Sequence, residues 1–326
     1  MRIAITGGSG FIGSNLINFL NKKKFKLLNI DKLSYASTPE KFKDLQNKKN
    51  YKFVKLNICN FKLLKKKLIN FKPKIIVNLA ANSHVDRSIM EPKKFFNENI
   101  LITQNILEFL RENKKIKLIH MSTDEVYGST KNKFYEHSTL DPSSPYSSSK
   151  ASIDLLISSY SKTYNLNCCI LRASNNFGPY QFTEKFIPKI ITNILKNLSI
   201  PVYGKGSNVR EWTYVDDTCR AIENIILNFQ KDCIYNVGSG FCNKNIFIAK
   251  KILSNFPNTS SKIKFVRDRA AHDFRYALNS SKIKKKIGWK AKVTLGDGIL
   301  KTINWYMLNP DWINHAEKKY QGKRLG

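Results

Sequence analysis

The stretch "ITGGSGFIGS", residues 5–14, overlaps the apolar run "RIAIT" (2–6) and leads into a segment with helical periodicity. The turn contains four glycines, at positions 7, 8, 10 and 13. Glycine adopts left-handed backbone angles easily, lets backbone N–H groups approach a pyrophosphate, and packs closely where a helix meets a strand. A strand, this turn and a helix in succession therefore predict the phosphate-binding turn of a dinucleotide-binding fold.

An acidic residue follows the glycine turn at the distance that such folds use. Asp31 ends the apolar run "KLLNID" (26–31), 18 positions after Gly13. A carboxylate at the end of the second strand can accept hydrogen bonds from both ribose hydroxyls of adenosine and would repel a 2′-phosphate. The sequence therefore favours NAD over NADP, although Lys32 adjoins the acid and could tolerate a phosphate.

Apolar runs and segments with helical periodicity alternate through the first two-thirds of the chain. Runs typical of strands cover residues 2–6, 26–31, 51–57, 74–80, 116–122 and 167–175. Segments typical of helices cover residues 13–23, 61–71, 93–113 and 145–164. This alternation predicts an α/β fold with a Rossmann-like, doubly wound parallel sheet, covered on both faces and binding ligands beyond the carboxyl ends of its strands.

After residue 176 the alternation gives way to shorter elements separated by prolines and glycines. We expect an NAD-binding Rossmann domain at 1–175, to which the chain returns within about 212–240, where the turn-rich "YNVGSG" lies. Residues 176–211 and 241–326 then form a smaller C-terminal α/β region that binds the substrate.

The chain of 326 residues carries a formal net charge of +32, which by itself suggests a polyanionic partner. Only ten of its 56 basic residues are arginine, however, and the lysines occur in runs such as "NKKKFK" and "LKKKL" that are typical of solvated surface. Proteins that bind nucleic acid favour arginine and interleaved aromatic residues. Nucleic acid is therefore not an expected partner.

Neither a leader segment nor a stretch of about 18 uncharged apolar residues is evident in the sequence. We therefore expect a cytoplasmic protein that does not associate with membranes. Six cysteines, at positions 59, 168, 169, 219, 233 and 242, show no metal-ligand spacing. We expect them to be reduced, and we expect no metal site.

Two adjacent acids follow a predicted strand in "LIHMSTDEVYG" (118–128). The apolar run reaches Thr123, and Asp124 and Glu125 come next. Repulsion between neighbouring, partly buried carboxylates raises one pKa, so one group stays protonated while the other is ionised. The pair can therefore act as a general acid and a general base.

A tyrosine and a lysine lie four residues apart in "SSPYSSSKAS" (143–152), at the start of a predicted helix. At this spacing the side chains of Tyr146 and Lys150 project from one helix face. A phenol has an unperturbed pKa of about 10. A nearby cation favours the phenolate, which makes Tyr146 a candidate base.

Together, "TGGSGFIGS", Asp31 and "YSSSK" resemble the extended short-chain dehydrogenase/reductase family, which acts largely on nucleotide sugars. Further stretches resemble, in order along the chain, the dTDP-glucose 4,6-dehydratases: "AANSHVDRS" (80–88), "STDEVYG" (122–128), "PSSPYSSSKA" (142–151), "ASNNFGPYQFTEKFIP" (173–188), "PVYGKGSNVREWTYVDD" (201–217), "DRAAHDFRYAL" (268–278), "NWYM" (304–307) and "YQGKRLG" (320–326). The paired Asp and Glu after the Thr are the most specific element, because related epimerases and decarboxylases lack them.

The resemblance implies conversion of dTDP-glucose to dTDP-4-keto-6-deoxyglucose and water, by oxidation at C4, elimination across C5 and C6, and hydride return to C6. A ketone at C4 acidifies the C5 hydrogen, so base and acid must act on neighbouring carbons. The resemblance assigns the acid role to Asp124 and the base role to Glu125. It also implies that Tyr146 takes the C4 hydroxyl proton while Thr123 hydrogen-bonds the same oxygen, and that Lys150 holds the cofactor ribose and lowers the tyrosine pKa.

The resemblance further implies a tightly bound NAD that is regenerated in each turnover, a nucleotide-diphosphate sugar as substrate, and a homodimer formed through helices near 95–112 and 146–163. The implied cofactor-binding residues are Gly7, Gly10, Phe11, Ile12, Gly13, Asp31, Lys32, Leu33, Ser34, Asn57, Ile58, Leu79, Ala80, Ala81, Ser83, Tyr146, Lys150 and Asn176. The implied substrate-binding residues are Ser83, Thr123, Asn175, Glu184, Lys185, Pro201, Val202, Tyr203, Arg210, Asn245, Arg269 and His272.

Three positions depart from the family pattern. Asn57 stands where an adenine-binding Asp is usual, Glu98 replaces a Thr near the nicotinamide ribose, and "DRAAHDF" (268–274) replaces the commoner "DRPGHDR". Alternative functions are a UDP-glucose 4,6-dehydratase, a 4-epimerase or a decarboxylase on the same scaffold, or a non-catalytic protein that senses NAD or binds nucleic acid. The acid pair together with Tyr146 and Lys150 favours the dehydratase.

Overall fold

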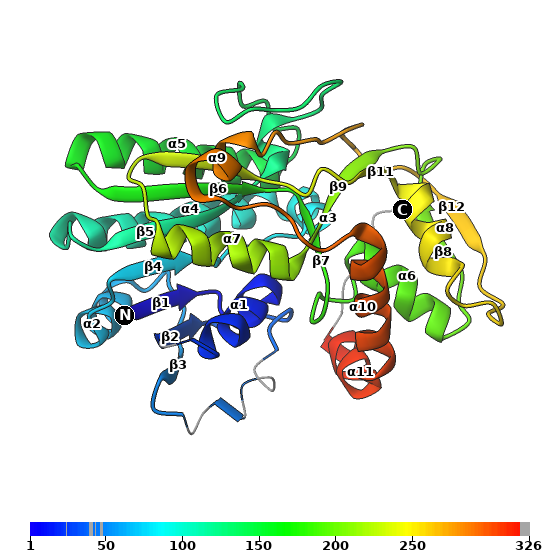
Figure 1. Ribbon diagram of the computed structural model, residues 1–326, viewed down its shortest axis with the longest axis horizontal. Helices are drawn as coiled ribbons and strands as arrows, with labels where there is room; N and C mark the ends of the chain where they lie inside the picture. Colours follow the sequence, from blue (N-terminus) through cyan, green and yellow to red (C-terminus); the bar gives the residue numbers. More distant parts are fainter. Residues whose placement is uncertain (24, 39–41, 43, 46–47, 320–326) are drawn as a thin grey trace.

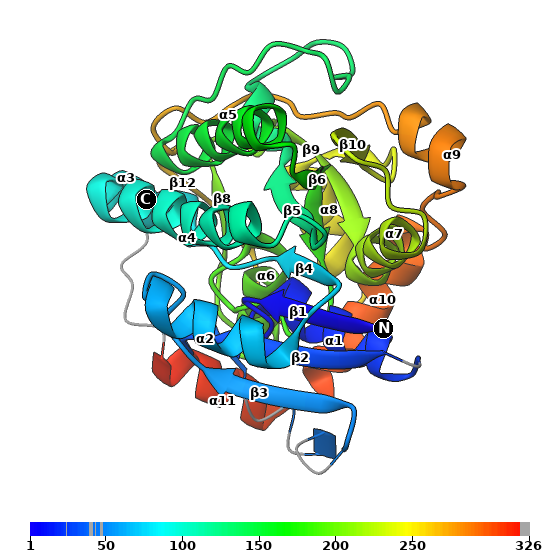
Figure 2. The same ribbon diagram turned by 90° about the vertical axis from the view of Figure 1, so that its left-hand side faces the viewer.

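A parallel sheet of seven strands forms the centre of the computed structural model (Figures 1 and 2). The order across the sheet is β10 (Cys233–Val237), β6 (Asn167–Ala173), β5 (Lys117–Thr123), β4 (Ile75–Asn78), β1 (Arg2–Thr6), β2 (Lys26–Asp31) and β3 (Tyr51–Lys55). The structure describes residues 1–23, 25–38, 42, 44–45 and 48–319, so the closing "YQGKRLG" lies outside the described residues. The predicted α/β fold with a doubly wound parallel sheet is confirmed.

Helices cover both faces of this sheet because each strand alternates its side chains between two apolar cores. Ile3 and Ile5 of β1 are buried in the core beneath one helical layer, whereas Ala4 is buried in the core beneath the other. The first layer consists of α1 (Phe11–Asn21), α7 (Val215–Leu227) and α9 (Ser281–Ile287). The second consists of α2 (Phe61–Phe71), α4 (Pro92–Glu112) and α5 (Pro145–Tyr164). Figure 2 shows the two layers on opposite sides of the twisted sheet.

A smaller set of elements packs beside the sheet around a third apolar core (Figure 1). Its strands are β7 (Asn175–Phe177), β9 (Val209–Tyr214) and β11 (Cys242–Lys244) in one sheet, and β8 (Ile200–Tyr203) and β12 (Ile263–Val266) in another. Its helices are α6 (Phe186–Leu195), α8 (Asn245–Leu253), α10 (Leu295–Met307) and α11 (Pro310–Lys319). The chain rejoins the main sheet at β10, which pairs with β6. The division into residue ranges 1–175, 176–211, 212–240 and 241–326 stays a prediction.

Two short helices lie where strands of the main sheet end. They are α3 (Val85–Met90), which follows β4, and the 3₁₀ helix η2 (Asp124–Tyr127), which follows β5 directly. Within the described residues, no helix combines the length and the apolar character needed to cross a bilayer.

Asp217 connects the C-terminal segment to the main sheet. Its side chain is fully buried in α7, and its two carboxylate oxygens accept hydrogen bonds from the backbone N–H groups of Lys292 (2.8 Å) and Val293 (3.0 Å). The carbonyl oxygen of Asp217 also accepts a hydrogen bond from Trp289 Nε1 at 2.9 Å. This residue therefore fixes the segment that leads into α10.

We expect Asp217→Ala to lower the free energy of unfolding by roughly 1–3 kcal/mol, because two backbone donors and the Arg220 guanidinium lose their acceptor. Urea denaturation measures this loss. The matched control is Asp216→Ala in the same helical turn, which removes mainly a helix N-terminal charge and should cost less than about 1 kcal/mol. Equal losses in the two variants would contradict the anchoring role of Asp217.

Candidate active site

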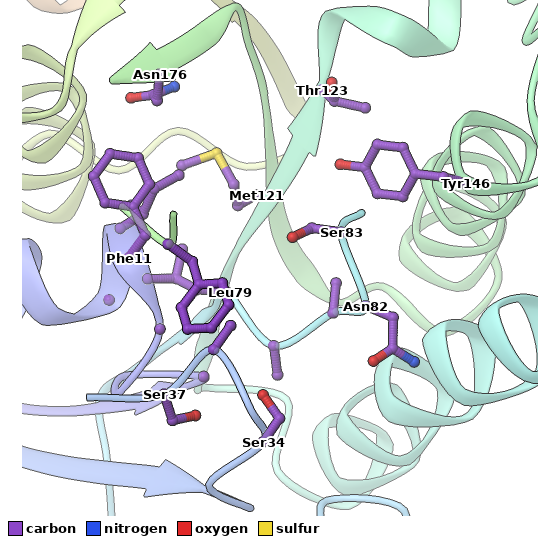
Figure 3. Close-up of a pocket in the computed structure, with 18 of the residues that line it drawn as sticks. Phe11, Ser34, Ser37, Leu79, Asn82, Ser83, Met121, Thr123, Tyr146 and Asn176 are labelled. Carbon is purple, nitrogen blue, oxygen red and sulfur yellow. The ribbon is translucent and has the colours of Figure 1, made fainter. Parts of the chain in front are cut away.

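A cavity of about 310 Å³ lies at the carboxyl edge of the main sheet. Its walls come from the turn after β1, the loop after β2, the ends of β4, β5 and β6, and the start of α5. Figure 3 shows side chains from these segments converging on the cavity. Parallel strands that share one direction must bring their carboxyl ends together, so the sheet itself assembles this site.

The glycine turn between β1 and α1 leaves no space for side chains at two positions. Gly7 has φ +68°, and a Cβ atom there would lie 2.7 Å from the backbone of Ala80. A Cβ atom on Gly13 would lie 2.3 Å from the carbonyl oxygen of Gly7. Gly10, by contrast, lines the cavity and would meet only one atom, at 3.4 Å. The turn therefore packs tightly inward and presents bare backbone to the cavity, which fits a pyrophosphate.

Asp31 is held in place by the surrounding loop. Its carboxylate accepts hydrogen bonds from the backbone N–H groups of Ser9 (2.9 Å) and Leu33 (2.7 Å) and from the hydroxyl of Ser37 (3.2 Å). A carboxylate offers about four lone-pair positions. Accepting both ribose hydroxyls, as the sequence predicts, therefore requires the long bond from Ser37 to break.

Most of the residues predicted to bind the cofactor lie on the cavity wall. Those on the wall are Gly7, Gly10, Phe11, Ile12, Gly13, Asp31, Lys32, Ser34, Asn57, Ile58, Leu79, Ala80, Ala81, Ser83, Tyr146, Lys150 and Asn176. Leu33 does not line the cavity and contributes its backbone N–H to Asp31 instead. The residues present therefore fit a dinucleotide.

Sequence reasoning missed other residues of the same wall. These are Tyr35, Ala36, Ser37, Leu56, Asn82, Ile102, Met121, Ser122, Ala173, Ser174, Gln181 and Phe182. Proximity to Asp31 in sequence could have indicated the first three. Gln181 and Phe182 come from a loop far along the chain, within the stretch 173–188 that resembles the family, and that resemblance could have indicated them.

The acid pair begins a single helical turn at the end of β5. Thr123 caps this turn, since its Oγ1 accepts a hydrogen bond from the backbone N–H of Glu125 (3.3 Å). Thr123 Oγ1 also donates to Asp124 Oδ1 at 3.2 Å, and both Asp124 and Glu125 line the cavity. The cap therefore aims two consecutive carboxylates into one space.

The surroundings of the two carboxylates differ. Burial, followed by the charges of Glu125 and Glu211, raises the pKa of Asp124 well above its usual value. Burial also raises the pKa of Glu125, but the charges of Arg269, Arg210 and Lys185 oppose that shift. Asp124 is therefore the better proton donor, and Glu125 is the group more easily kept ionised.

Tyr146 and Lys150 lie at the start of α5, which a capping box at Ser144 begins. The Tyr146 hydroxyl points into the cavity in Figure 3 and forms a hydrogen bond with Thr123. Burial and then Glu125 raise the pKa of Tyr146, so the charges of the chain alone do not produce the lowering that the sequence predicts. Lys150 Nζ donates to the carbonyl oxygen of Met121 at 2.5 Å, and burial lowers the pKa of this lysine to about 8.

A second cavity of about 150 Å³ adjoins the first. The two share five wall residues, namely Ser83, Glu125, Asn175, Glu184 and Lys185. The second cavity is also lined by the predicted substrate-binding residues Tyr203, Arg210, Asn245, Arg269 and His272. Glu125 therefore faces both the predicted cofactor cavity and the predicted substrate cavity.

Basic side chains from three distant segments meet in the second cavity. Lys185 precedes α6, Arg210 lies on β9, and Arg269 follows β12. His272 Nδ1 lies 2.7 Å from Asp268 Oδ1, and burial lowers the pKa of His272 to about 4, so this ring is neutral near pH 7. Three cations and a neutral hydrogen-bonding ring suit a diphosphate.

Three predicted substrate residues are placed differently from the others. Pro201 and Val202 line neither cavity. Val202 is buried in the third apolar core, on the opposite side of β8 from Pro201 and Tyr203. Glu184 lines both cavities, but its carboxylate accepts hydrogen bonds from Tyr35 (2.7 Å) and Arg87 (3.2 Å). Glu184 thus connects the loop after β2 with α3.

Asp86 of α3 is a residue of the second cavity that sequence reasoning missed. Its carboxylate accepts a hydrogen bond from the Tyr203 hydroxyl (2.9 Å) and pairs with Arg269 Nη1 (3.5 Å). It therefore orients two of the predicted substrate-binding side chains. No group of three or more potential metal ligands occurs within the described part of the chain.

Comparisons with known proteins agree with this geometry. The profile of the GDP-mannose 4,6 dehydratase family matches residues 4–302. A probable dTDP-glucose 4,6-dehydratase of Sinorhizobium fredii is 41% identical over 345 residues, covering 100% of this chain and 99% of the relative.

Solved structures of dTDP-glucose 4,6-dehydratases are also similar. The Streptomyces venezuelae protein DesIV, with NAD and TYD bound, has a TM-score of 0.93 at 36% identity, covering 97% of this chain and 100% of the other. The Bacillus anthracis protein in complex with NAD has a TM-score of 0.89 at 38% identity, covering 97% and 99%. The chain therefore belongs to the dTDP-glucose 4,6-dehydratases of the extended short-chain dehydrogenase/reductase family.

Proposed function

We propose that the protein is an NAD-dependent hydro-lyase that converts dTDP-glucose to dTDP-4-keto-6-deoxyglucose and water. The observation that carries this proposal is the position of Glu125, which lines both cavities while Asp124, Thr123 and Tyr146 line the first. A 4-epimerase or a decarboxylase has no use for two adjacent carboxylates at this junction. The acid pair therefore favours dehydration over these alternatives.

The glycine turn, Asp31 and the wall residues around them would hold NAD. When bound, this cofactor supplies a hydride acceptor for the sugar C4 and a positively charged ring. Tyr146 takes the proton of the C4 hydroxyl, and Thr123, which is hydrogen-bonded to Tyr146, positions that oxygen. A further positive charge in the cavity acts in the direction that lowers the pKa of Tyr146.

Elimination of water is the task of the acid pair. Once C4 is a ketone, Glu125 removes the acidified proton at C5, and Asp124 protonates the departing C6 hydroxyl. The raised pKa of Asp124 keeps its proton available, while the cations around Glu125 favour its ionised form. These same cations, Lys185, Arg210 and Arg269, would hold the diphosphate of the substrate.

We further propose a cytoplasmic homodimer formed through α4 and α5. Apolar side chains on these two helices support this: Phe96 is 39% exposed, Leu101 41% and Leu155 63%. Two-fold dimers are also the commonest soluble oligomers. Leu155→Glu should shift sedimentation from dimer to monomer at micromolar concentration. The matched control, Leu300→Glu on α10, should leave the dimer intact, and a dimer that persists in both variants would contradict this interface.

The decisive experiment is to incubate the purified protein with dTDP-glucose, without added cofactor, and to measure the alkali-induced absorbance of a 4-keto-6-deoxy sugar. We expect Glu125→Gln to retain oxidation at C4 and to accumulate reduced cofactor while it loses dehydration. The matched control is Glu91→Gln, an exposed carboxylate that pairs with Lys94 and lines neither cavity, which should behave as the wild type. Simultaneous loss of oxidation and dehydration in Glu125→Gln would remove Glu125 from the assigned role.

The pH dependence of dehydration tests the role of Asp124. A general acid works only when protonated, so the elimination rate should fall as pH rises through the raised pKa of Asp124. Asp124→Asn should lower the rate of elimination by about 10²-fold or more and abolish this alkaline decline. The measurement is the single-turnover rate of C6 deoxygenation across pH, and an unchanged alkaline decline in the variant would assign the titration to another group.

A further inference from the structure

Lys32, the residue after Asp31, forms an ion pair across the edge of the cofactor cavity. Its Nζ lies 2.7 Å from Glu98 Oε2. Lys32 lines the cavity, whereas Glu98 belongs to α4 and does not line it. Glu98 thus lies beside the residue that follows Asp31, and not near the nicotinamide ribose as the resemblance implies. Lys32 and Glu98 are 66 positions apart in sequence, so the contact is a product of the fold.

A second donor fixes the Glu98 carboxylate. Asn82 Nδ2 donates to the same oxygen, Glu98 Oε2, at 3.0 Å. Asn82 is itself held by Asn99, whose Oδ1 accepts from the Asn82 N–H (2.7 Å) and whose Nδ2 donates to the Asn82 carbonyl (3.1 Å). Glu98 is therefore a fixed negative charge rather than a mobile surface carboxylate.

This arrangement matters for the ribose end of the dinucleotide. NADP carries a 2′-phosphate with a charge of about −2, which would come close to the Asp31 carboxylate and would need a cation beside it. The described cavity wall carries three cations, Lys32, Lys150 and Lys185. Lys150 Nζ donates to the Met121 carbonyl and Lys185 Nζ to the Ser83 carbonyl (2.8 Å), both at the catalytic end of the cavity. Lys32 is therefore the cation adjacent to Asp31, and Glu98 already engages it.

We propose that Glu98 is a specificity-determining residue that excludes NADP, because its ion pair with Lys32 withholds that lysine from a 2′-phosphate. The inference rests on the proposed NAD-dependent function, but it concerns cofactor choice rather than turnover. Asp31 alone leaves the choice open, because an adjacent free lysine would partly neutralise a phosphate. The Glu98–Lys32 pair removes that possibility.

The test is a competition experiment in which unlabelled NADP or unlabelled NAD displaces labelled NAD from the full-length protein. For each competitor, the concentration that displaces half of the label is measured. The ratio of the two concentrations reports specificity without any turnover, so it is also obtained from a protein that lacks dehydratase activity. Glu98→Gln is isosteric and removes only the charge. We expect it to lower the ratio of the half-displacing concentration of NADP to that of NAD about fivefold to tenfold. The concentration of unlabelled NAD that displaces half of the label should change less than about twofold.

Two further variants make the result specific. In the double variant Lys32→Gln/Glu98→Gln the gain for NADP should disappear, because the released lysine is what binds the phosphate. The matched control is Glu112→Gln on the same helix, which breaks the pair of Glu112 with Lys65 (2.6 Å) and should leave the ratio unchanged. The proposal would be overturned by an unchanged ratio in Glu98→Gln or by an equal change of the ratio in Glu112→Gln. It would also be overturned if the stronger binding of NADP persisted in the double variant that lacks Lys32.

Discussion

The site depends on an unequal electrostatic field across two neighbouring carboxylates. Strand β5 ends at Thr123, and the cap formed by this residue keeps Asp124 and Glu125 in one helical turn. Asp124 is buried and Glu125 is partly buried, and desolvation raises the pKa of each, but the cations of the second cavity oppose the shift mainly at Glu125. Because Lys185, Arg210 and Arg269 come from three separate segments, the smaller C-terminal elements are required to set the field, even though the carboxylates belong to the main sheet.

The register of the sheet aligns a row of polar side chains that runs from β1, the strand before the glycine turn, to α5, the helix that carries Tyr146 and Lys150. Thr6, Asn78 and His120 are paired neighbours on β1, β4 and β5. Thr6 Oγ1 donates to Asn78 Oδ1 (2.6 Å), Asn78 Nδ2 lies 3.0 Å from His120 Nδ1, and His120 Nε2 lies 3.0 Å from Lys150 Nζ. Burial and then the charge of Lys150 keep the pKa of His120 well below its usual value, so the ring is neutral. A slip of one residue would turn this row to the other face and separate Lys150 from the sheet.

The sequence predicts the local features of the fold and the site well, because each depends on a short pattern. The alternation of apolar runs predicts the strands of the main sheet, the glycine turn predicts the entry to α1, and "TDE" predicts the acid pair. Features formed between distant segments are not predictable in this way. The contact between Asp86 and Arg269 joins residues 183 positions apart, and no pattern near either residue indicates it.

Two predicted site residues make different contacts in the structure from those that the sequence pattern indicates. The resemblance implies that Val202 and Tyr203 both contact the substrate, but alternation along β8 turns Val202 into the apolar core. The spacing of Tyr146 and Lys150 on one helix face predicts that Lys150 acts on the Tyr146 hydroxyl. The length of the lysine side chain instead lets its ammonium reach the Met121 carbonyl on β5. Helical spacing therefore predicts where a side chain starts but not where a long one ends.

Buried polar atoms without a hydrogen-bond partner occur both on the walls of the two cavities and elsewhere among the described residues. Away from the cavities, Arg172 and Asp154 are buried together and joined by a hydrogen bond of 2.8 Å, but Asp154 Oδ1 has no partner among the described residues. Around the two cavities, buried atoms also lack partners among the described residues: Asp124 Oδ2, Asn175 Oδ1, Asn245 Oδ1 and Arg269 Nε. A buried polar atom without a partner costs roughly 1–3 kcal/mol. Such atoms are retained at a net cost to stability on the walls that a nucleotide sugar would contact, where its hydroxyl and phosphate groups can supply the missing hydrogen bonds.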